Sequence, residues 1–487
     1  MKELKSYAKI WQVILCLALC FLSLIPHLIT SDISLIEYPL EDLSYCDAYI
    51  QQFDAFKKKQ IYIDIEPEQD LLELENPYDW DQRKEKGVFY LWDRALYNGK
   101  YYSYFGIAPI ITIYAPFFAV SGHLPTPTIT CFILAVIGII AIFYAYYNLL
   151  RFFKIHPPSY IFLAGLLAVE FASLLPMLFS SADMYYIASC SAVTNLALFF
   201  AFFYEAMLKS ILKTRNIFFI LASLSFSFLL LSRPGLCLFG IIILPCLISV
   251  FFTKKTKLKK KISSFICLAL PLGLTVIFTE IYNYMRFDSV FEFGARYQLT
   301  VYDVSEYSLT PALILPCLIT YFLQLPRIKS SFPFIELDLA NMHIPTDYLY
   351  RTSTIGAFAF PSNWGFFVIA SVLSKPKRKY LIQKFTYLLF FISIAVLAFI
   401  DICMGGVNIR YFADISFAMI LLTSLILAEI PSFFSESKKV VRAIVKIIIV
   451  LLLLSSAFLG FLLIFENERN YILTAIVELK NMSAAGF

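Results

Sequence analysis

The chain has 487 residues, of which 60% are hydrophobic and only 15% are charged, and its mean hydropathy is +0.74. This balance is too apolar for a soluble globular protein and is typical of a polytopic membrane protein. The formal net charge of +5 does not indicate nucleic-acid binding, because the lysines and arginines gather in short runs between apolar stretches. We therefore expect an all-α integral membrane protein with no nucleic-acid partner.

The first apolar stretch, residues 10–30, follows Lys2, Lys5 and Lys9. It is long enough to cross a bilayer and lacks a small-residue cleavage pattern, so we expect an uncleaved transmembrane helix with a cytoplasmic N-terminus. Further stretches of bilayer length bring the expected total to about eleven transmembrane helices. They comprise residues 128–150, 159–179, 184–206, 217–231, 236–252, 262–282, 355–373, 380–400, 412–430 and 443–465.

Basic residues predict how these helices are oriented. If the chain alternates sides, the five predicted cytoplasmic loops all carry lysine or arginine, as the positive-inside rule expects. This requires that the proline-containing apolar stretches 107–120 and 309–325 do not cross, and we expect them to be helices in the outer interface. The localisation predicted is the plasma membrane, with an extracytoplasmic C-terminus.

This topology divides the chain into six units. They are a first transmembrane helix (1–30), an extracytoplasmic loop with the candidate active site (31–127), transmembrane helices 2–7 (128–284), a second extracytoplasmic region (285–354), transmembrane helices 8–11 (355–465) and an extracytoplasmic tail (466–487). No predicted cytoplasmic loop is long enough for a nucleotide-binding domain, and the sequence has neither a GxxxxGK nor a strand-associated GxGxxG motif. A soluble nucleotide donor or an ATP-driven motor is therefore not expected.

The loop after the first helix is rich in carboxylates and aromatic residues. Asp47 precedes Tyr49, Phe53 and Phe56, whose spacing predicts a short helix near the membrane surface. Asp47 could cap that helix, or it could be a reactive carboxylate at headgroup depth. Farther on, the run ENPYDWDQR holds Asp79 and Asp81, which could bind one cation or an acceptor together or bond to their own loop backbone.

An acid followed by an aromatic residue directly after the first helix resembles the opening of the GT-C superfamily of polyprenyl-phosphate-sugar-dependent glycosyltransferases. This class includes protein mannosyltransferases and aminoarabinose transferases. The resemblance implies that Asp47 is the catalytic base and that Asp183, in SSADMYY, is the second catalytic acid. Arg410 with Tyr411 is similar to the late Arg-Tyr pair of the family.

The segment NGKYYSYFGIAP, residues 98–109, looks like the aromatic, glycine- and proline-containing stretch of the same family. Ile107 stands where the family often has a lysine, and Lys100 is the candidate for that role. In the second outer region, Arg286 and Arg296 flank several aromatic residues. Their guanidinium groups could grip the donor phosphate or anionic lipid headgroups, because both offer the same oxygen acceptors.

The resemblance implies transfer of a sugar, with inversion, from a polyprenyl-phosphate donor to an extracytoplasmic glycan, lipid or protein acceptor. Asp47 would take the acceptor proton, and Lys100 or the arginines would stabilise the departing phosphate. The sequence does not identify a cofactor. A divalent cation, Mg²⁺ or Mn²⁺, could bridge the phosphate to Asp183 or Asp79.

Two other functions remain open from the sequence. Glu170, deep in an apolar stretch, could mark an ion or proton path in a transporter or a lipid or glycan flippase, or it could hydrogen-bond between helices. The outer region that begins at residue 285 leaves open another function, that of a polysaccharide polymerase or ligase.

Overall fold

The computed structural model describes residues 4–466 apart from 253–256, 302, 307–310, 338–352 and 371–380. In this part of the chain, nine helical segments are long and apolar enough to cross a membrane. They are α1 (Ile10–Thr30), α6 (Pro127–Phe153), α7 (Ser159–Ala172) with α8 (Leu175–Ser180), α9 (Met184–Leu208), α10 (Leu212–Leu230), α12 (Leu258–Phe287), α15 (Leu381–Gly405), α16 (Ile409–Phe433) and α17 (Lys439–Leu463). The predicted all-α membrane fold is confirmed, and the chain is a multi-pass membrane protein.

Two of the eleven predicted helices differ from the expectation. The stretch 236–252 forms the 3-10 helix η3 (Pro234–Ile243), which continues into α11 (Leu244–Phe252) and is shorter than the other spans. The described part of 355–373 contains the 3-10 helices η6 (Ala357–Ala359) and η7 (Pro361–Val368), and α-helical structure is described only at residues 369–370. Pro361 cannot donate a backbone hydrogen bond and therefore favours a break in regular helix at this point.

The helix bundle has a buried centre and an apolar rim. Helices α9 and α16 are the most enclosed by the rest of the chain, together with α7, whereas α12, α17 and α1 are largely uncovered. The uncovered helices carry exposed apolar side chains such as Leu274 on α12 and Phe458 on α17. Apolar side chains on the rim are expected where lipid, rather than water, surrounds the helices.

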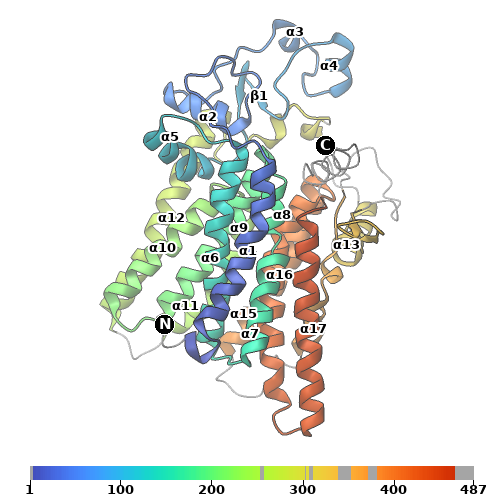
Figure 1. The fold of residues 1–487 in the computed structure, drawn as a ribbon. Coiled ribbons are helices and arrows are strands. Elements are labelled where there is room, and N and C mark those ends of the chain that lie inside the picture. Colours follow the sequence, from blue (N-terminus) through green and yellow to red (C-terminus); the bar gives the residue numbers. More distant parts are fainter. Residues whose placement is uncertain are drawn as a thin grey trace.

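The segment between α1 and α6 folds into a cap, defined here as residues 31–126, that covers one end of the bundle (Figure 1). It contains α2 (Ala48–Lys57), α3 (Gln69–Leu72), α4 (Trp80–Lys86), η2 (Ile110–Tyr114), α5 (Ala115–Ser121) and the antiparallel strands β1 (Ala95–Tyr97) and β2 (Lys100–Tyr102). The strands pair Ala95 with Tyr102 and Tyr97 with Lys100. Asn98 and Gly99 have φ values of +47° and +68°, as a tight two-residue hairpin turn requires.

The chain after α12 joins this cap. Leu299 accepts a hydrogen bond from Asp93 and donates one to Arg94, at 3.0 and 2.9 Å between nitrogen and oxygen. Leu299 is fully buried in the small apolar core of the cap. The remaining elements are η1 (Leu4–Ser6), η4 (Ala295–Tyr297), η5 (Val304–Glu306), α13 (Pro311–Leu323), β3 (Arg327–Ile328) and β4 (Ile335–Glu336).

The two stretches predicted not to cross contain η2 with α5 and α13. Both are apolar but fall below the length of the nine spanning segments. Helix α13 has 13 residues, so its length of about 20 Å is well short of the roughly 30 Å hydrocarbon core.

Candidate active site

A cavity of about 580 Å³ lies where the cap meets the bundle. Its wall is built from the chain before β1, the segment 104–106, the starts of α9 and α16, the end of α15 and the turn into η3. The lining residues with ionisable or strongly polar side chains include Asp93, Tyr185, Arg233, Asp401, Arg410 and Asp414. The volume lies within the range of roughly 300 to 1,000 Å³ that is usual for ligand pockets.

The cavity is at the mouth of the bundle rather than at its middle. Tyr185 is the second residue of α9, Arg410 is the second residue of α16, and Asp401 lies in the last turns of α15. These helix ends meet the cap (Figure 1). In a membrane, the ends of spanning helices lie near the depth of lipid headgroups.

Asp93 holds one side of the cavity and has an unusual backbone, with φ at +53°. It is 6% exposed, and it accepts a hydrogen bond from the Tyr185 hydroxyl. The Trp92 indole N–H donates to the same hydroxyl at 3.2 Å. Burial raises the pKa of the Asp93 carboxyl, while its hydrogen bonds and the charges of Arg410 and Arg94 act in the opposite direction.

Asp93 and Arg94 do not form the local ion pair that their adjacency suggests. Arg94 is buried and donates instead to the side chain of Gln51 at 2.6 Å and to the carbonyls of Trp92 and Cys46 at 2.9 and 3.3 Å. The physical reason is the left-handed backbone at Asp93, which turns the chain so that the two neighbouring side chains meet different partners.

Asp47 caps α2, as the simpler interpretation predicted. Its Oδ1 accepts the backbone N–H groups of Tyr49 and Ile50 at 2.8 and 3.1 Å, so the cap uses a single oxygen. The side chain is half-buried. Burial raises the pKa of the Asp47 carboxyl and Asp183 adds to this, whereas the two backbone N–H groups and the charge of Arg94 oppose it.

Asp183 caps α9 in the same way, accepting from the backbone of Tyr185 and Tyr186 at 2.8 and 3.1 Å. The charge of Asp183 makes a small contribution to the raised pKa of Asp47. Neither is among the residues that line the cavity. Asp183 is bonded to the backbone of one lining residue, Tyr185. Arg94, whose charge acts on Asp47, follows the lining residue Asp93 in the sequence.

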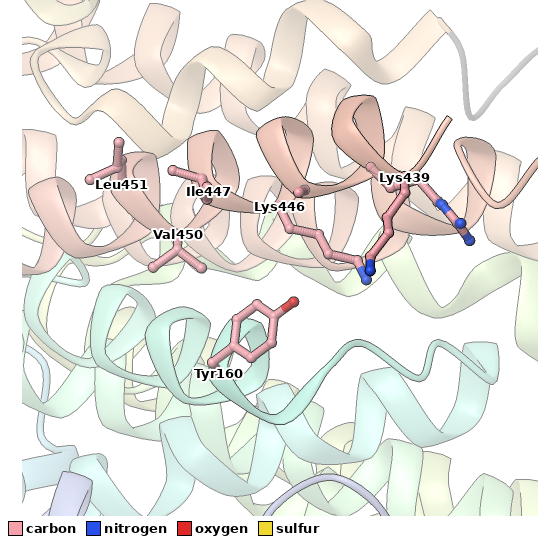
Figure 2. Close-up of a pocket in the computed structure, with 8 residues that line it drawn as sticks. Tyr160, Lys439, Lys446, Ile447, Val450 and Leu451 are labelled. Atoms are coloured by element: carbon pink, nitrogen blue, oxygen red, sulfur yellow. The ribbon is translucent and has the colours of Figure 1, made fainter. Parts of the chain in front are cut away.

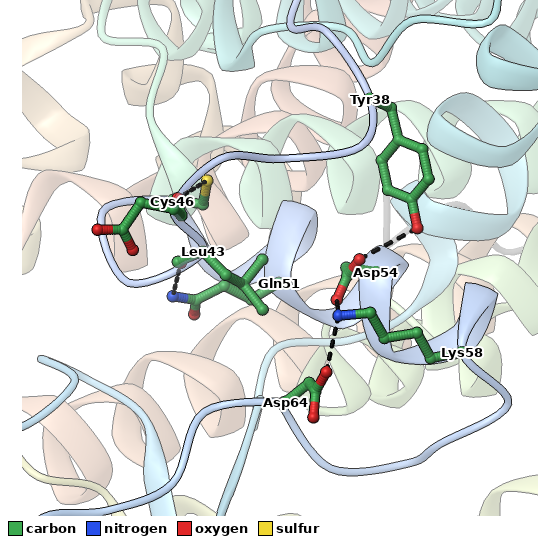
Figure 3. Close-up of polar contacts among 8 residues, drawn as sticks. Tyr38, Leu43, Cys46, Gln51, Asp54, Lys58 and Asp64 are labelled. Atoms are coloured by element: carbon green, nitrogen blue, oxygen red, sulfur yellow. Dashed lines mark hydrogen bonds and ion pairs between the residues drawn. The ribbon is translucent and has the colours of Figure 1, made fainter.

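Polar contacts hold α2, the helix that Asp47 caps, against the surrounding loop (Figure 3). Lys58 bridges Asp54 and Asp64 at 2.9 and 2.7 Å, and the Tyr38 hydroxyl donates to Asp54 at 3.1 Å. Near the start of the helix, Gln51 donates to the carbonyl of Leu43 at 2.9 Å. These contacts tie both ends of α2 to the surrounding loop.

The cavity lining also includes two arginines, Arg233 and Arg410. Arg233 pairs with Asp414 at 2.5 Å and donates to Ser189 at 3.1 Å. The Arg410 guanidinium lies 4.3 Å from the ring centroid of Tyr185, a cation–π arrangement, and within the described residues it forms no ion pair. Tyr411 lines the cavity between the two arginines, with ring distances of 5.4 Å to Arg233 and 5.9 Å to Arg410.

The other predicted phosphate ligands lie elsewhere. Lys100 is exposed on β2, with its ammonium 4.0 Å from the ring of Tyr62. Arg286 is buried at the end of α12 and donates to the carbonyl of Ser103 at 2.7 Å, so it ties that helix to the cap. Arg296 is exposed in η4, next to Ala295, which lines the cavity.

Asp81 lies on α4 and Asp79 directly precedes this helix, which is at the far side of the cap from the bundle (Figure 1). Asp79 caps this helix by accepting the backbone N–H of Asp81 at 2.8 Å. Across the described residues, no group of three or more His, Cys, Asp and Glu side chains is arranged to hold a metal ion.

Several cavity residues were not identified from the sequence. Arg233 and Asp414 carried a usable signal, because each is an ionisable residue at the edge of or inside an apolar stretch. Tyr185 carried none, since tyrosines are common at membrane interfaces. Glu170, which the sequence singled out, is fully buried in α7, and neither of its carboxylate oxygens has a hydrogen-bond partner in the described part of the chain.

No protein-family model and no curated protein matches this sequence. Solved structures do match its fold. The apo oligosaccharyltransferase of Archaeoglobus fulgidus aligns with a TM-score of 0.50 and 13% identity, over 93% of this chain and 56% of that one. A complex of the oligosaccharyltransferase AglB from the same organism with an inhibitory peptide and a dolichol-phosphate aligns with a TM-score of 0.47 and 10% identity, over 93% and 55%. The chain therefore spans about half the length of the structures it matches.

Proposed function

We propose that this chain, which has the fold of GT-C glycosyltransferases, is a membrane glycosyltransferase that takes its sugar from a polyprenyl-phosphate donor. The acceptor is an extracytoplasmic glycan, lipid or protein, and the anomeric configuration is inverted. The observation that carries this proposal is the cavity at the cap end of the bundle, which joins carboxylates and arginines at the depth of lipid headgroups.

The arginines suit the donor phosphate. A guanidinium group donates two parallel hydrogen bonds to phosphate oxygens. Asp414 already neutralises Arg233, whereas Arg410 forms no ion pair within the described residues. We therefore assign the phosphate to Arg410, with Arg233 and Tyr411 beside it. Arg296, at the edge of the cavity, would meet the donor on its way in.

Asp47 is the proposed base. As the acceptor hydroxyl attacks the anomeric carbon, its proton passes to Asp47, and the bond from that carbon to the phosphate oxygen breaks with its electron pair leaving on the phosphate. Arg410 stabilises the charge that develops there. A raised pKa suits the role, because a stronger base takes the proton more readily.

The remaining residues would position substrates. Trp92, Tyr104 and Phe105 line the cavity and offer aromatic faces to a sugar ring. A divalent cation, if one is used, would be held by Asp47 and Asp183 and would supply charge stabilisation to the leaving phosphate. A flippase or transporter is less well supported, because Arg233, Asp401, Arg410 and Asp414 gather at one end of the bundle rather than along a path through it.

The test is sugar transfer from a lipid-linked donor by the Asp47→Asn variant. Asparagine is nearly isosteric and still caps a helix, so folding should be preserved. We expect transfer to fall by 100-fold to 10,000-fold, the usual contribution of a general base.

Asp42→Asn is the matched control. Asp42 is an exposed carboxylate five residues earlier whose oxygen accepts from Ser44, so its loss should leave transfer unchanged. Transfer by Asp47→Asn at the rate of this control would rule out Asp47 as the base.

A further inference from the structure

A second cavity lies at the end of the bundle away from the cap. It is a groove of about 720 Å³ between α17 and the start of α7. Tyr160 of α7 faces it, and Figure 2 shows the Tyr160 hydroxyl and the ends of Lys439 and Lys446 pointing toward the same space. The lining residues are Tyr160, Lys439, Arg442, Ala443, Lys446, Ile447, Val450 and Leu451.

The groove has a charged end and an apolar end. Lys439, Arg442 and Lys446 follow one another at spacings of three and four residues, so they lie on one face of α17. Ile447 and Leu451 continue the lining toward the middle of the membrane span and remain 58% and 59% exposed. A ligand that fills both parts needs an anionic head and an apolar tail.

The charges of the groove are not balanced from within. Its eight described lining residues include three cations and no carboxylate. Arg442 donates one hydrogen bond, to the carbonyl of Ser435 at 3.2 Å, and keeps its charge. Cations gathered at one site repel one another, and an anion placed among them removes this cost.

An adjoining cavity of about 420 Å³ extends the basic end. It shares Arg442 and Lys446 with the groove and adds Lys154 from the end of α6. It also contains Glu429, whose carboxylate accepts a hydrogen bond from Gln383 at 2.8 Å. The charged end therefore has room for a headgroup larger than a bare phosphate.

We propose that this groove is a binding site for one anionic phospholipid. The lipid phosphate lies among Lys439, Arg442 and Lys446 and accepts a hydrogen bond from the Tyr160 hydroxyl, while an acyl chain covers Ile447 and Leu451. Basic pockets between transmembrane helices favour anionic lipid headgroups for this electrostatic reason. The proposal is independent of the glycosyltransferase function and does not involve the cavity under the cap.

The test is native mass spectrometry of the full chain in detergent, titrated with dioleoyl-phosphatidylglycerol. We expect one retained lipid on the wild type. In the triple variant that combines Lys439→Gln, Arg442→Gln and Lys446→Gln, we expect the affinity for this lipid to fall on the order of 100-fold. This corresponds to about fivefold for each cation removed near the lipid surface. Tyr160→Phe, which removes a single hydroxyl, should show a smaller loss.

The matched control is a second triple variant, which combines Lys257→Gln, Lys259→Gln and Lys260→Gln. It removes three exposed cations at the start of α12 that do not line the groove. It should bind like the wild type, and both triple variants should melt at the same temperature without added lipid. Equal affinities for the two triple variants would overturn the proposal. Equally tight binding of dioleoyl-phosphatidylcholine, or displacement of the lipid by inorganic phosphate at matching concentration, would overturn it as well.

Discussion

Asp47 and Asp183 occupy the same position in their helices, each accepting two backbone N–H groups on one carboxylate oxygen at the helix start. The partial positive charge of a helix N-terminus stabilises an ionised carboxylate. Burial and a second carboxylate have the opposite effect, and for Asp47 the net result is a raised pKa. Capping therefore holds the acid in place without removing its basicity.

This balance makes a prediction about pH. Asp47 acts as a carboxylate, so activity falls as the pH drops through its pKa. Because the charge of Asp183 raises that pKa, we expect Asp183→Asn to lower the rate and to move the acid limb of the kcat/KM profile toward lower pH. The measurement is the pH dependence of kcat/KM in wild type, Asp183→Asn and the Asp42→Asn control. An acid limb that stays in place, or moves to higher pH, would contradict the electrostatic link.

At the scale of elements, the cap is fixed to the bundle by close backbone contact beside the cavity. The N–H of Ala108 donates to the carbonyl of Leu231, at the end of α10, at 3.0 Å. Two residues earlier, a Cβ on Gly106 would lie only 2.1 Å from that carbonyl oxygen and 2.6 Å from that of Ser232. Glycine is needed here because backbone atoms, unlike side-chain ends, cannot move aside.

We expect Gly106→Ala to push the segment 104–106 away from the turn between α10 and η3. Overpacking of this kind typically costs about 1 to 3 kcal/mol. The variant should unfold at lower temperature in detergent and lose transfer activity, because this segment lines the cavity.

Gly273→Ala is the control, since a Cβ at that position of α12 meets nothing within 4 Å. Alanine also favours helix over glycine, so this control should be neutral or slightly stabilising. Equal melting temperatures for Gly106→Ala and the wild type would show that the cap can shift without cost.

At the scale of the whole molecule, the two ends of the bundle carry different chemistry. The cap covers one end of the bundle, and α17 begins at the other (Figure 1). The cavity with carboxylates and arginines lies at the cap end, and the basic groove lies beside the start of α17. The positive-inside rule predicts that the groove end faces the cytoplasm and the cap faces outward. The predicted extracytoplasmic tail, residues 466–487, lies almost entirely outside the described residues.

This orientation can be tested by labelling with a membrane-impermeant thiol reagent in a chain whose ten native cysteines have been replaced by serine. We expect Asp81→Cys, exposed on α4 of the cap, to react in intact cells. Lys260→Cys, at the start of α12, should react only after the membrane is permeabilised. The reverse pattern would place the cap in the cytoplasm and would exclude an extracytoplasmic acceptor.

Composition and the spacing of apolar stretches were sufficient to predict the membrane fold, and nine of the predicted spans are long helical segments in the described part of the chain. A spanning helix satisfies its own backbone hydrogen bonds, so its existence depends on local sequence alone. The capping role of Asp47 was likewise local and was predicted as one of two interpretations.

Only the tertiary structure decided which side chains share the cavity. Asp93, Tyr185, Arg233 and Arg410 lie far apart in the sequence, and they meet because helix ends and the cap converge. It also separated Asp93 from Arg94 by turning the backbone, and it buried Arg286 as a tie between α12 and the cap. Charge and residue type indicate which groups can bind a phosphate, but contact between distant segments determines which of them are placed to do so.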